Sequence, residues 1–279
     1  MALFGILGIL WLSAIGLTIA QRIKPNFARS WIIAITGASL ALIGALVLRL
    51  YLPIEINLIH WQPESLYHTT IAFRIDYLNW SYMVANLALC IAVILTDSSR
   101  ASATTTPQTS AGALVVTGLS LLSIMSKGPL TMSIAWAVID FSVLIYLLIL
   151  THDPTGTAKL TTFYGVRLVS NFVLIAATAI GWQVTAGLGF DQIPPTASLF
   201  FLIAAGLRLG VLMLNPPMLE SAELKRGTGL LLRFTPVASA LVLIAYLPSE
   251  ILILKQSLVS IISILTVLAA LFASAMWFT

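Results

Sequence analysis

The chain has 279 residues, of which 59% are hydrophobic and only 9% are charged, and its formal net charge is +4. A soluble domain has roughly 25% charged residues, so this composition excludes a water-soluble fold. The apolar runs are about 17–22 residues long, as helices that cross a hydrocarbon core require, and they lack the short alternating segments of a membrane β-barrel. The sequence therefore predicts an all-α integral membrane protein in a lipid bilayer.

About nine transmembrane helices are expected, and they cover residues 3–20, 31–52, 78–96, 112–126, 130–150, 162–183, 197–214, 229–247 and 257–278. Between the second and third spans, the alternating runs IEINLI and TIAFRI flank a turn that contains Pro, Glu and Ser. This pattern predicts a small β-hairpin outside the membrane. Lys and Arg are concentrated in alternate loops, which favours an orientation with the N-terminus outside.

Four ionisable residues lie well inside predicted spans five to eight, in the order Asp140, Arg167, Arg208 and Arg233. A charge at the centre of a membrane helix costs roughly 2.5–3.5 kcal/mol, so such residues usually face the protein interior and pair with one another. Three interpretations stay open. The residues line a hydrated half-channel in which Asp140 titrates, they form a fixed ion-pair network, or they contact only backbone carbonyls or the membrane surface.

The seventh span ends in Asn215-Pro216-Pro217, followed by a polar stretch. Proline removes a backbone donor and clashes with the preceding helical turn. The sequence therefore predicts a helix broken near 215–217, and the alternative is an ordinary helix end with proline just after it.

No redox or metal site is predicted. The single cysteine, Cys90, excludes an internal disulfide and an iron–sulfur centre. The histidines His60, His68 and His152 fall in loops or at helix ends. Positive residues are scattered, so nucleic acid is not an expected partner. We expect no catalytic residue, cofactor or metal ligand in this chain.

The order of these features resembles the antiporter-like membrane subunits of respiratory complex I and their Mrp-type cation/proton antiporter relatives. The family opens a helix after a loop hairpin with F-x-I-D, which here is Phe73-Arg74-Ile75-Asp76. Two helices later it has a Trp-Glu pair before a Tyr-Leu-Leu run. This chain has Trp136, then Asp140, then Tyr146-Leu147-Leu148, so Asp140 stands within one position of the family glutamate.

The family's broken helix carries a central lysine and a later histidine. Here Arg208 stands in place of the lysine and Asn215 in place of the histidine. The next family helix carries another Lys or His where this chain has Ser239, and the charge appears earlier, at Arg233. Lysine can lose its proton when buried, whereas arginine stays charged. The resemblance thus implies a counter-charge for Asp140 but the loss of a proton-carrying step.

The family has about fourteen helices built as two inverted repeats. The resemblance implies that residues 1–110 are the first three helices with the hairpin loop, that 111–247 form one antiporter-like five-helix repeat, and that 248–279 form a C-terminal helix. It also implies a membrane subunit of a complex I-like, NADH dehydrogenase-related assembly that takes part in, or structurally supports, proton or cation translocation. Partners would be other membrane subunits, antiporter-like chains among them.

Two rival functions stay open. One is a component of a cation/proton antiporter or of an ion-coupled bicarbonate uptake complex, and the other is a non-conducting scaffold subunit. Whether the chain is part of an enzyme depends on those partners, because a redox centre would belong to them. The expected location is a bacterial inner membrane or an equivalent energy-transducing membrane.

Overall fold

The computed structural model describes residues 2–23, 26–57, 71–99, 108–150, 154–184, 189–190, 193–210 and 226–248, together with the single positions 260, 264 and 267. Eight long helices are described: α1 (Ala2–Ile23), α2 (Phe27–Leu48), α4 (Tyr77–Ser99), α5 (Gln108–Ile124), α6 (Pro129–Leu150), α7 (Pro154–Val184), α8 (Pro195–Leu209) and α9 (Arg226–Tyr246). Each of the first eight predicted spans falls on one of them. The ninth, 257–278, lies outside the described residues except for three helical positions.

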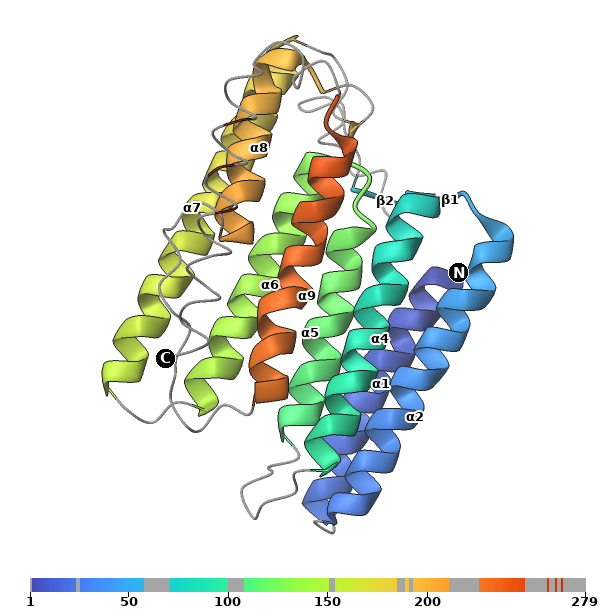
Figure 1. Cartoon of the computed structure of the whole chain (residues 1–279). Coiled ribbons are helices and arrows are strands. Elements are labelled where there is room, and N and C mark those ends of the chain that lie inside the picture. Colours follow the sequence, from blue (N-terminus) through green and yellow to red (C-terminus); the bar gives the residue numbers. More distant parts are fainter. Residues whose placement is uncertain are drawn as a thin grey trace.

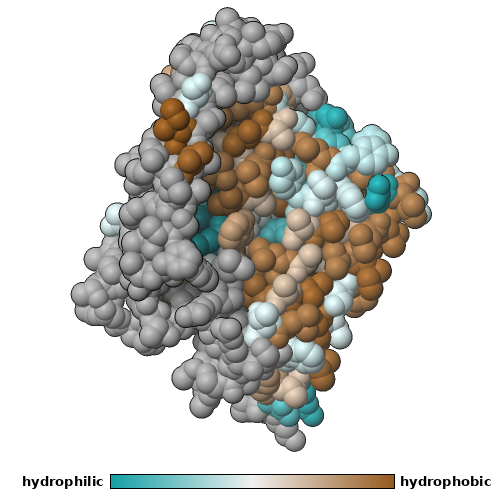
Figure 2. All heavy atoms as spheres, viewed as in Figure 1, coloured by the Kyte–Doolittle hydropathy of each residue, from teal (hydrophilic) through white to brown (hydrophobic). Residues whose placement is uncertain are grey.

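The helices run up and down beside one another as a bundle (Figure 1). Five of them, α1, α2, α4, α6 and α7, are long and apolar enough to cross a membrane, while α5, α8 and α9 provide shorter apolar segments. The apolar surface on the right of Figure 2 is broad, and hydrophilic residues gather near the strands. The chain is therefore a multi-pass, all-α membrane protein, as its composition predicts.

Local sequence explains where several helices begin. Proline occupies the first position of α6, α7 and α8, where a helix needs no backbone N–H donor. Asn26 caps α2 by accepting a hydrogen bond from the amide of Ala28 at 3.0 Å.

The predicted hairpin is confirmed. Strands β1 (Ile54–Asn57) and β2 (Ala72–Ile75) pair antiparallel, with Ile54 opposite Ile75. The segment that joins them lies outside the described residues. Strand β2 also bonds to the α5–α6 connection, where the Arg74 amide donates to the Met125 carbonyl at 2.7 Å and the Lys127 amide donates to the Ala72 carbonyl at 3.0 Å. The hairpin is thereby fastened to one end of the bundle.

Polar side chains join two helices, and a connection to a strand, at this hairpin end. The Asp76 carboxylate caps α4 by accepting from the amide of Asn79 at 2.9 Å. The Tyr246 hydroxyl, at the end of α9, donates to Asp76 Oδ2 at 2.5 Å. Lys127, just before α6, pairs with Glu55 of β1 at 2.8 Å. The acidic residue of the F-x-I-D run thus has a structural role: it starts one helix and holds the end of another.

The seventh span is shorter than predicted. It was expected to reach Leu214, but α8 ends at Leu209 because Gly210 takes a left-handed conformation with φ 77° and ψ 12°. This conformation is easy for glycine and ends a helix by turning the chain away. Fifteen residues make a helix of about 22 Å, less than the roughly 30 Å hydrocarbon core. Figure 1 shows that α8 ends partway along the bundle.

α5 is the central helix, packed against α1, α4, α6 and α9. Its Gly112 meets α6 closely, because a Cβ atom there would lie 2.2 Å from Cε2 of Tyr146. At Gly165 of α7 a Cβ would have nothing within 4 Å. The two glycines can therefore be compared directly: both lie in helices, but only Gly165 has room for a methyl group.

Replacing Gly112 by Ala is expected to lower the free energy of unfolding by about 1–3 kcal/mol, because the Tyr146 ring must shift. Gly165→Ala should leave it unchanged or raise it by up to about 1 kcal/mol through better helix propensity. Denaturant unfolding of the two purified variants in detergent measures both effects. Equal stability of the variants would contradict the close α5–α6 approach.

Candidate functional site

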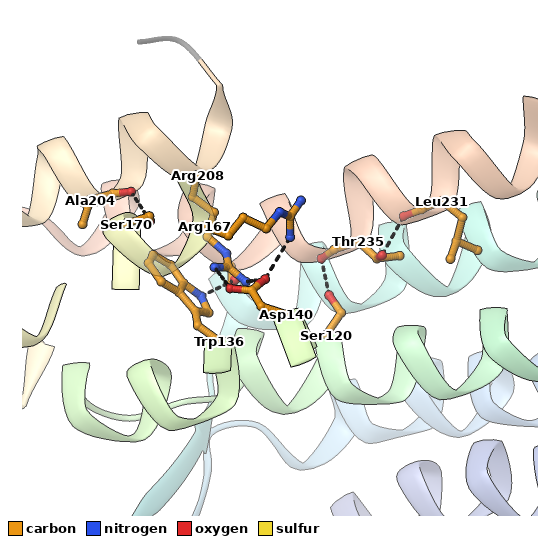
Figure 3. Close-up of polar contacts among 10 residues, drawn as sticks. Ser120, Trp136, Asp140, Arg167, Ser170, Ala204, Arg208, Leu231 and Thr235 are labelled. Carbon is orange, nitrogen blue, oxygen red and sulfur yellow. Dashed lines mark hydrogen bonds and ion pairs between the residues drawn. The ribbon is translucent and has the colours of Figure 1, made fainter. Parts of the chain in front are cut away.

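The buried charges come from three helices and meet about midway along the bundle. Asp140 lies eleven residues after Pro129, about 16 Å along α6, a helix about 33 Å long. Arg208 lies thirteen residues after Pro195, about 20 Å along α8. Arg167 is contributed by α7, which packs against both α6 and α8. We call Asp140, Arg167 and Arg208 the ion triad (Figure 3).

Both oxygens of the Asp140 carboxylate are bound by guanidinium groups. Arg208 makes a bidentate contact, with Nη1 2.9 Å from Oδ2 and Nη2 3.0 Å from Oδ1. Arg167 Nη1 adds a third bond, 3.0 Å from Oδ1. Bidentate guanidinium–carboxylate pairs are strong and directional. The predicted contact between Asp140 and Arg208 is confirmed, and Arg167, another of the charges expected to pair, is a second direct partner of Asp140.

The ion triad is almost completely removed from solvent, with exposed fractions of 2% for Asp140, 5% for Arg167 and 2% for Arg208. With every group ionised, one carboxylate faces two guanidiniums, so these three residues sum to one positive charge. Arg208 lies in the last turn of α8. The carbonyl end of a helix carries a partial negative charge, which favours a cation at that position.

Each guanidinium also lies against an aromatic ring. The Arg208 Cζ is 4.2 Å from the ring centre of Trp136, and the Arg167 Cζ is 4.6 Å from that of Phe163. In both cases a cation over the ring face is attracted by the π electrons. Trp136 precedes Asp140 by one turn of α6, so the helix itself presents ring and carboxylate to the same arginine. Each guanidinium group is thus held by an aromatic ring as well as by the Asp140 carboxylate.

The Trp136 indole extends the network to α9. Its Nε1 donates a hydrogen bond of 2.8 Å to the Ser239 hydroxyl, which is fully buried. Ser239 is the position at which the resemblance expects a titratable Lys or His. In this chain the position holds a neutral hydrogen-bond acceptor that orients the tryptophan.

The structure does not bury Arg233 with the ion triad. Arg233 lies on α9, but its side chain is exposed, whereas Thr235 and Ser239 of the same helix are buried. Two residues along a helix turn the direction of a side chain by about 200°, so Arg233 points away from the side that Thr235 occupies. The prediction of burial is therefore wrong for Arg233, and a role in an ion path stays a prediction. Asn215, Pro216 and Pro217 lie outside the described residues.

Further polar contacts on α7 surround the site. Ser170 donates to the Ala204 carbonyl of α8 at 2.9 Å, and Ser133 of α6 donates to Asn171 at 3.0 Å. These bonds hold α7 against both neighbours close to the ion triad. Across the described residues, no group of three His, Cys, Asp or Glu is placed to hold a metal ion. The contacts that the ion triad does make are those of an ion-pair network.

Asp140→Asn is expected to lower the free energy of unfolding by about 3–5 kcal/mol, because it leaves two buried cations without their carboxylate. Arg167→Met should cost less, since the neutral Asp140–Arg208 pair survives with both bonds. Glu55, which forms an exposed ion pair with Lys127, supplies the control. Glu55→Gln should lower the free energy of unfolding by at most about 1 kcal/mol. Thermal unfolding of the purified variants in detergent gives the order. A cost for Arg167→Met equal to that for Asp140→Asn would contradict the charge balance described here.

No family model matches the chain, and no curated protein matches it. Solved structures do share its fold. A chain in the structure of the membrane-bound sulfane sulfur reductase, an archaeal respiratory membrane complex, aligns with a TM-score of 0.64 at 16% identity, over 88% of this chain and 42% of its own length. A chain of the Mrp complex from Dietzia sp. DQ12-45-1b aligns with a TM-score of 0.66 at 14% identity, over 87% and 28%.

This chain therefore spans less than half the length of either chain with which it aligns. At such identities the likeness concerns the fold alone. The fold of this chain is that found in chains of an Mrp complex and of a respiratory membrane complex, as the resemblance of its motifs predicts.

Proposed function

We propose that the chain is a membrane subunit of a multi-subunit, complex I-like assembly, and that it structurally supports proton or cation translocation by companion chains. The observation that carries this proposal is that two buried arginines bind both oxygens of the Asp140 carboxylate. The shared fold with chains of two membrane complexes supports a role beside other membrane subunits. Under this proposal the membrane is energy-transducing, such as a bacterial inner membrane.

A translocating site needs groups that gain and lose protons during each cycle. The arginine side chain is a much stronger base than lysine or histidine, so it is poorly suited to such a cycle. Protonating Asp140 would weaken bonds to both arginines, since each of its oxygens already accepts a guanidinium N–H. Ser239 supplies no titratable group in the next helix. The ion triad is thus suited to hold a fixed charge arrangement.

The same contacts give the ion triad a mechanical role. α8 ends partway along the bundle at Gly210, and its last turn is held by Arg208. The carboxylate of α6 connects that turn to Arg167 of α7. A subunit built in this way resists displacement of the helix end and can support a moving neighbour.

A second candidate is a component of a cation/proton antiporter. The alignment with a chain of an Mrp complex favours it. An ion-coupled bicarbonate uptake complex would need the same kind of membrane subunit. The chains that co-purify with this one distinguish the candidates, because flavin or iron–sulfur proteins select the complex I-like assembly. A companion that supplies further antiporter-like helices without redox proteins selects the antiporter.

Purified chain alone, reconstituted in proteoliposomes with a pH-sensitive dye inside, is expected to give no proton flux above that of empty vesicles. The physical reason is that a guanidinium group is a poor proton carrier compared with the amine of a lysine or the imidazole of a histidine. Addition of a protonophore provides the positive control for the dye. Flux clearly above empty vesicles that Asp140→Asn abolishes would refute the structural role and favour a working half-channel.

The complete assembly separates the remaining cases. If Asp140→Asn lowers the yield of assembled complex but leaves flux per complex unchanged, the ion triad is structural, as proposed. If flux per complex falls while assembly is normal, Asp140 takes part in translocation. Glu55→Gln, an exposed carboxylate change, is the matched control for both measurements.

A further inference from the structure

Buried hydroxyl groups in the helices of this chain usually bond to their own backbone. The carbonyl four residues earlier is the acceptor, at 2.6–2.9 Å, for Thr178, Ser198 and Thr235. Others bond to a neighbouring helix, as Ser170 does with Ala204. In an apolar bundle each such bond removes the cost of burying a polar group.

Two hydroxyls of α5 depart from this rule. The Oγ1 of Thr117 and the Oγ of Ser123 are buried, and neither makes a hydrogen bond with the residues that the structure describes. Both residues have 0% exposure. The Cys90 thiol of α4 lies near enough to Thr117 to interact, but a thiol is a weak partner and this contact lacks hydrogen-bond geometry. A buried hydroxyl without a partner costs roughly 1–3 kcal/mol, so two on one helix need an explanation.

Ser120, between these two residues, shows which neighbours they approach. Its hydroxyl accepts from Asn86 of α4 at 3.0 Å and donates to the Thr235 carbonyl of α9 (Figure 3). Three residues along a helix turn a side chain by about 300°, so Thr117 and Ser123 lie about 60° to either side of Ser120. The three hydroxyls therefore share one side of α5, and we call them the hydroxyl strip.

We propose that the hydroxyl strip binds water molecules, which hydrogen-bond to Thr117 and Ser123 inside the bundle where α5 meets its neighbours. Buried water typically makes about three hydrogen bonds to polar groups that protein atoms leave unsatisfied. The three hydroxyls, and the Asn86 side-chain amide that bonds to one of them, can each donate and accept hydrogen bonds, as water requires. The strip contains no carboxylate that could bind a metal ion. The bound water replaces the missing partners and removes the cost of burial.

The hydroxyl strip also leads towards the ion triad. Thr235, which accepts from Ser120, lies one helical turn before Ser239 on α9. Ser239 in turn accepts from Trp136, whose ring lies under Arg208. The hydroxyl strip is thus connected, through α9, to the tryptophan that lies against Arg208. This inference does not depend on whether the ion triad is structural or conducting.

Cysteine reactivity tests for water at these positions. In a Cys90→Ala background, Thr117→Cys and Ser123→Cys are made in the full chain, with Leu114→Cys and Leu121→Cys as controls. Both leucines are fully buried on the same helix. Membrane vesicles are treated with methyl methanethiosulfonate, a small neutral reagent, and the remaining thiols are labelled with a fluorescent maleimide after denaturation. Only the thiolate reacts, and it forms where water solvates it.

The two strip variants are expected to react at least about tenfold faster than the leucine variants. Equal rates at all four positions would overturn the proposal. Removal of the hydroxyls gives a second measurement that does not need a cysteine. If water binds there, Thr117→Val and Ser123→Ala lower the midpoint of thermal unfolding, because the bound water loses a partner. If the strip is dry, both raise it by deleting an unsatisfied polar group, and that result would also overturn the proposal.

Discussion

The rest of this structure depends on one buried carboxylate. In a medium of low dielectric constant, the Arg167 and Arg208 side chains can stay inside the bundle only because Asp140 lies between them. The pairing determines how α6, α7 and α8 are rotated about their axes, since each must point one residue at the same spot. The aromatic rings of Trp136 and Phe163 then hold the faces of the guanidiniums. A charge network of this kind specifies one arrangement of helices where apolar packing alone would allow several.

The short helix α8 is a consequence of this arrangement. A helix that ends inside a membrane protein leaves carbonyl groups that need partners or a nearby positive charge. Gly210 allows the chain to turn, and its amide bonds back to the Gly206 and Leu207 carbonyls. Arg208 places a cation at the same end, where the helix dipole favours it. The ion triad therefore stabilises both the buried charges and the helix end that carries one of them.

Polar contacts are distributed unevenly over the bundle. At the hairpin end, Asp76, Asn79 and Tyr246 connect the first turn of α4 to the last turn of α9. Further in, Ser120 connects α4, α5 and α9, and Ser239 connects α9 to α6. α9 provides a partner at each of these places: Tyr246, the Thr235 carbonyl and Ser239. α9 therefore contacts both the hairpin end, through Tyr246, and Trp136 beside the ion triad, through Ser239.

The sequence by itself determined the membrane class, eight of the helices, the hairpin and the contact between Asp140 and Arg208. These features follow from run length, from residue alternation and from the cost of an unpaired charge in hydrocarbon, all of which are local or nearly so. Gly210 was a signal in the sequence for the early end of α8. The double proline after it was the stronger signal, and it led to the prediction of a helix end near residues 215–217. The division of the chain into leading helices, a repeat and a final helix stays a prediction.

Only the tertiary structure decided how each helix is rotated about its axis, and so which of its side chains are buried. Arg167 and Arg233 look alike in the sequence, each a single arginine in an apolar run, yet one lies in the ion triad and the other is exposed. The bond from Trp136 to Ser239 and the unpartnered hydroxyls of Thr117 and Ser123 likewise depend on the rotation of helices distant in the chain. In a bundle whose helices are apolar on nearly every side, hydrophobic periodicity is too weak to fix that rotation, so long-range packing and charge pairing decide it.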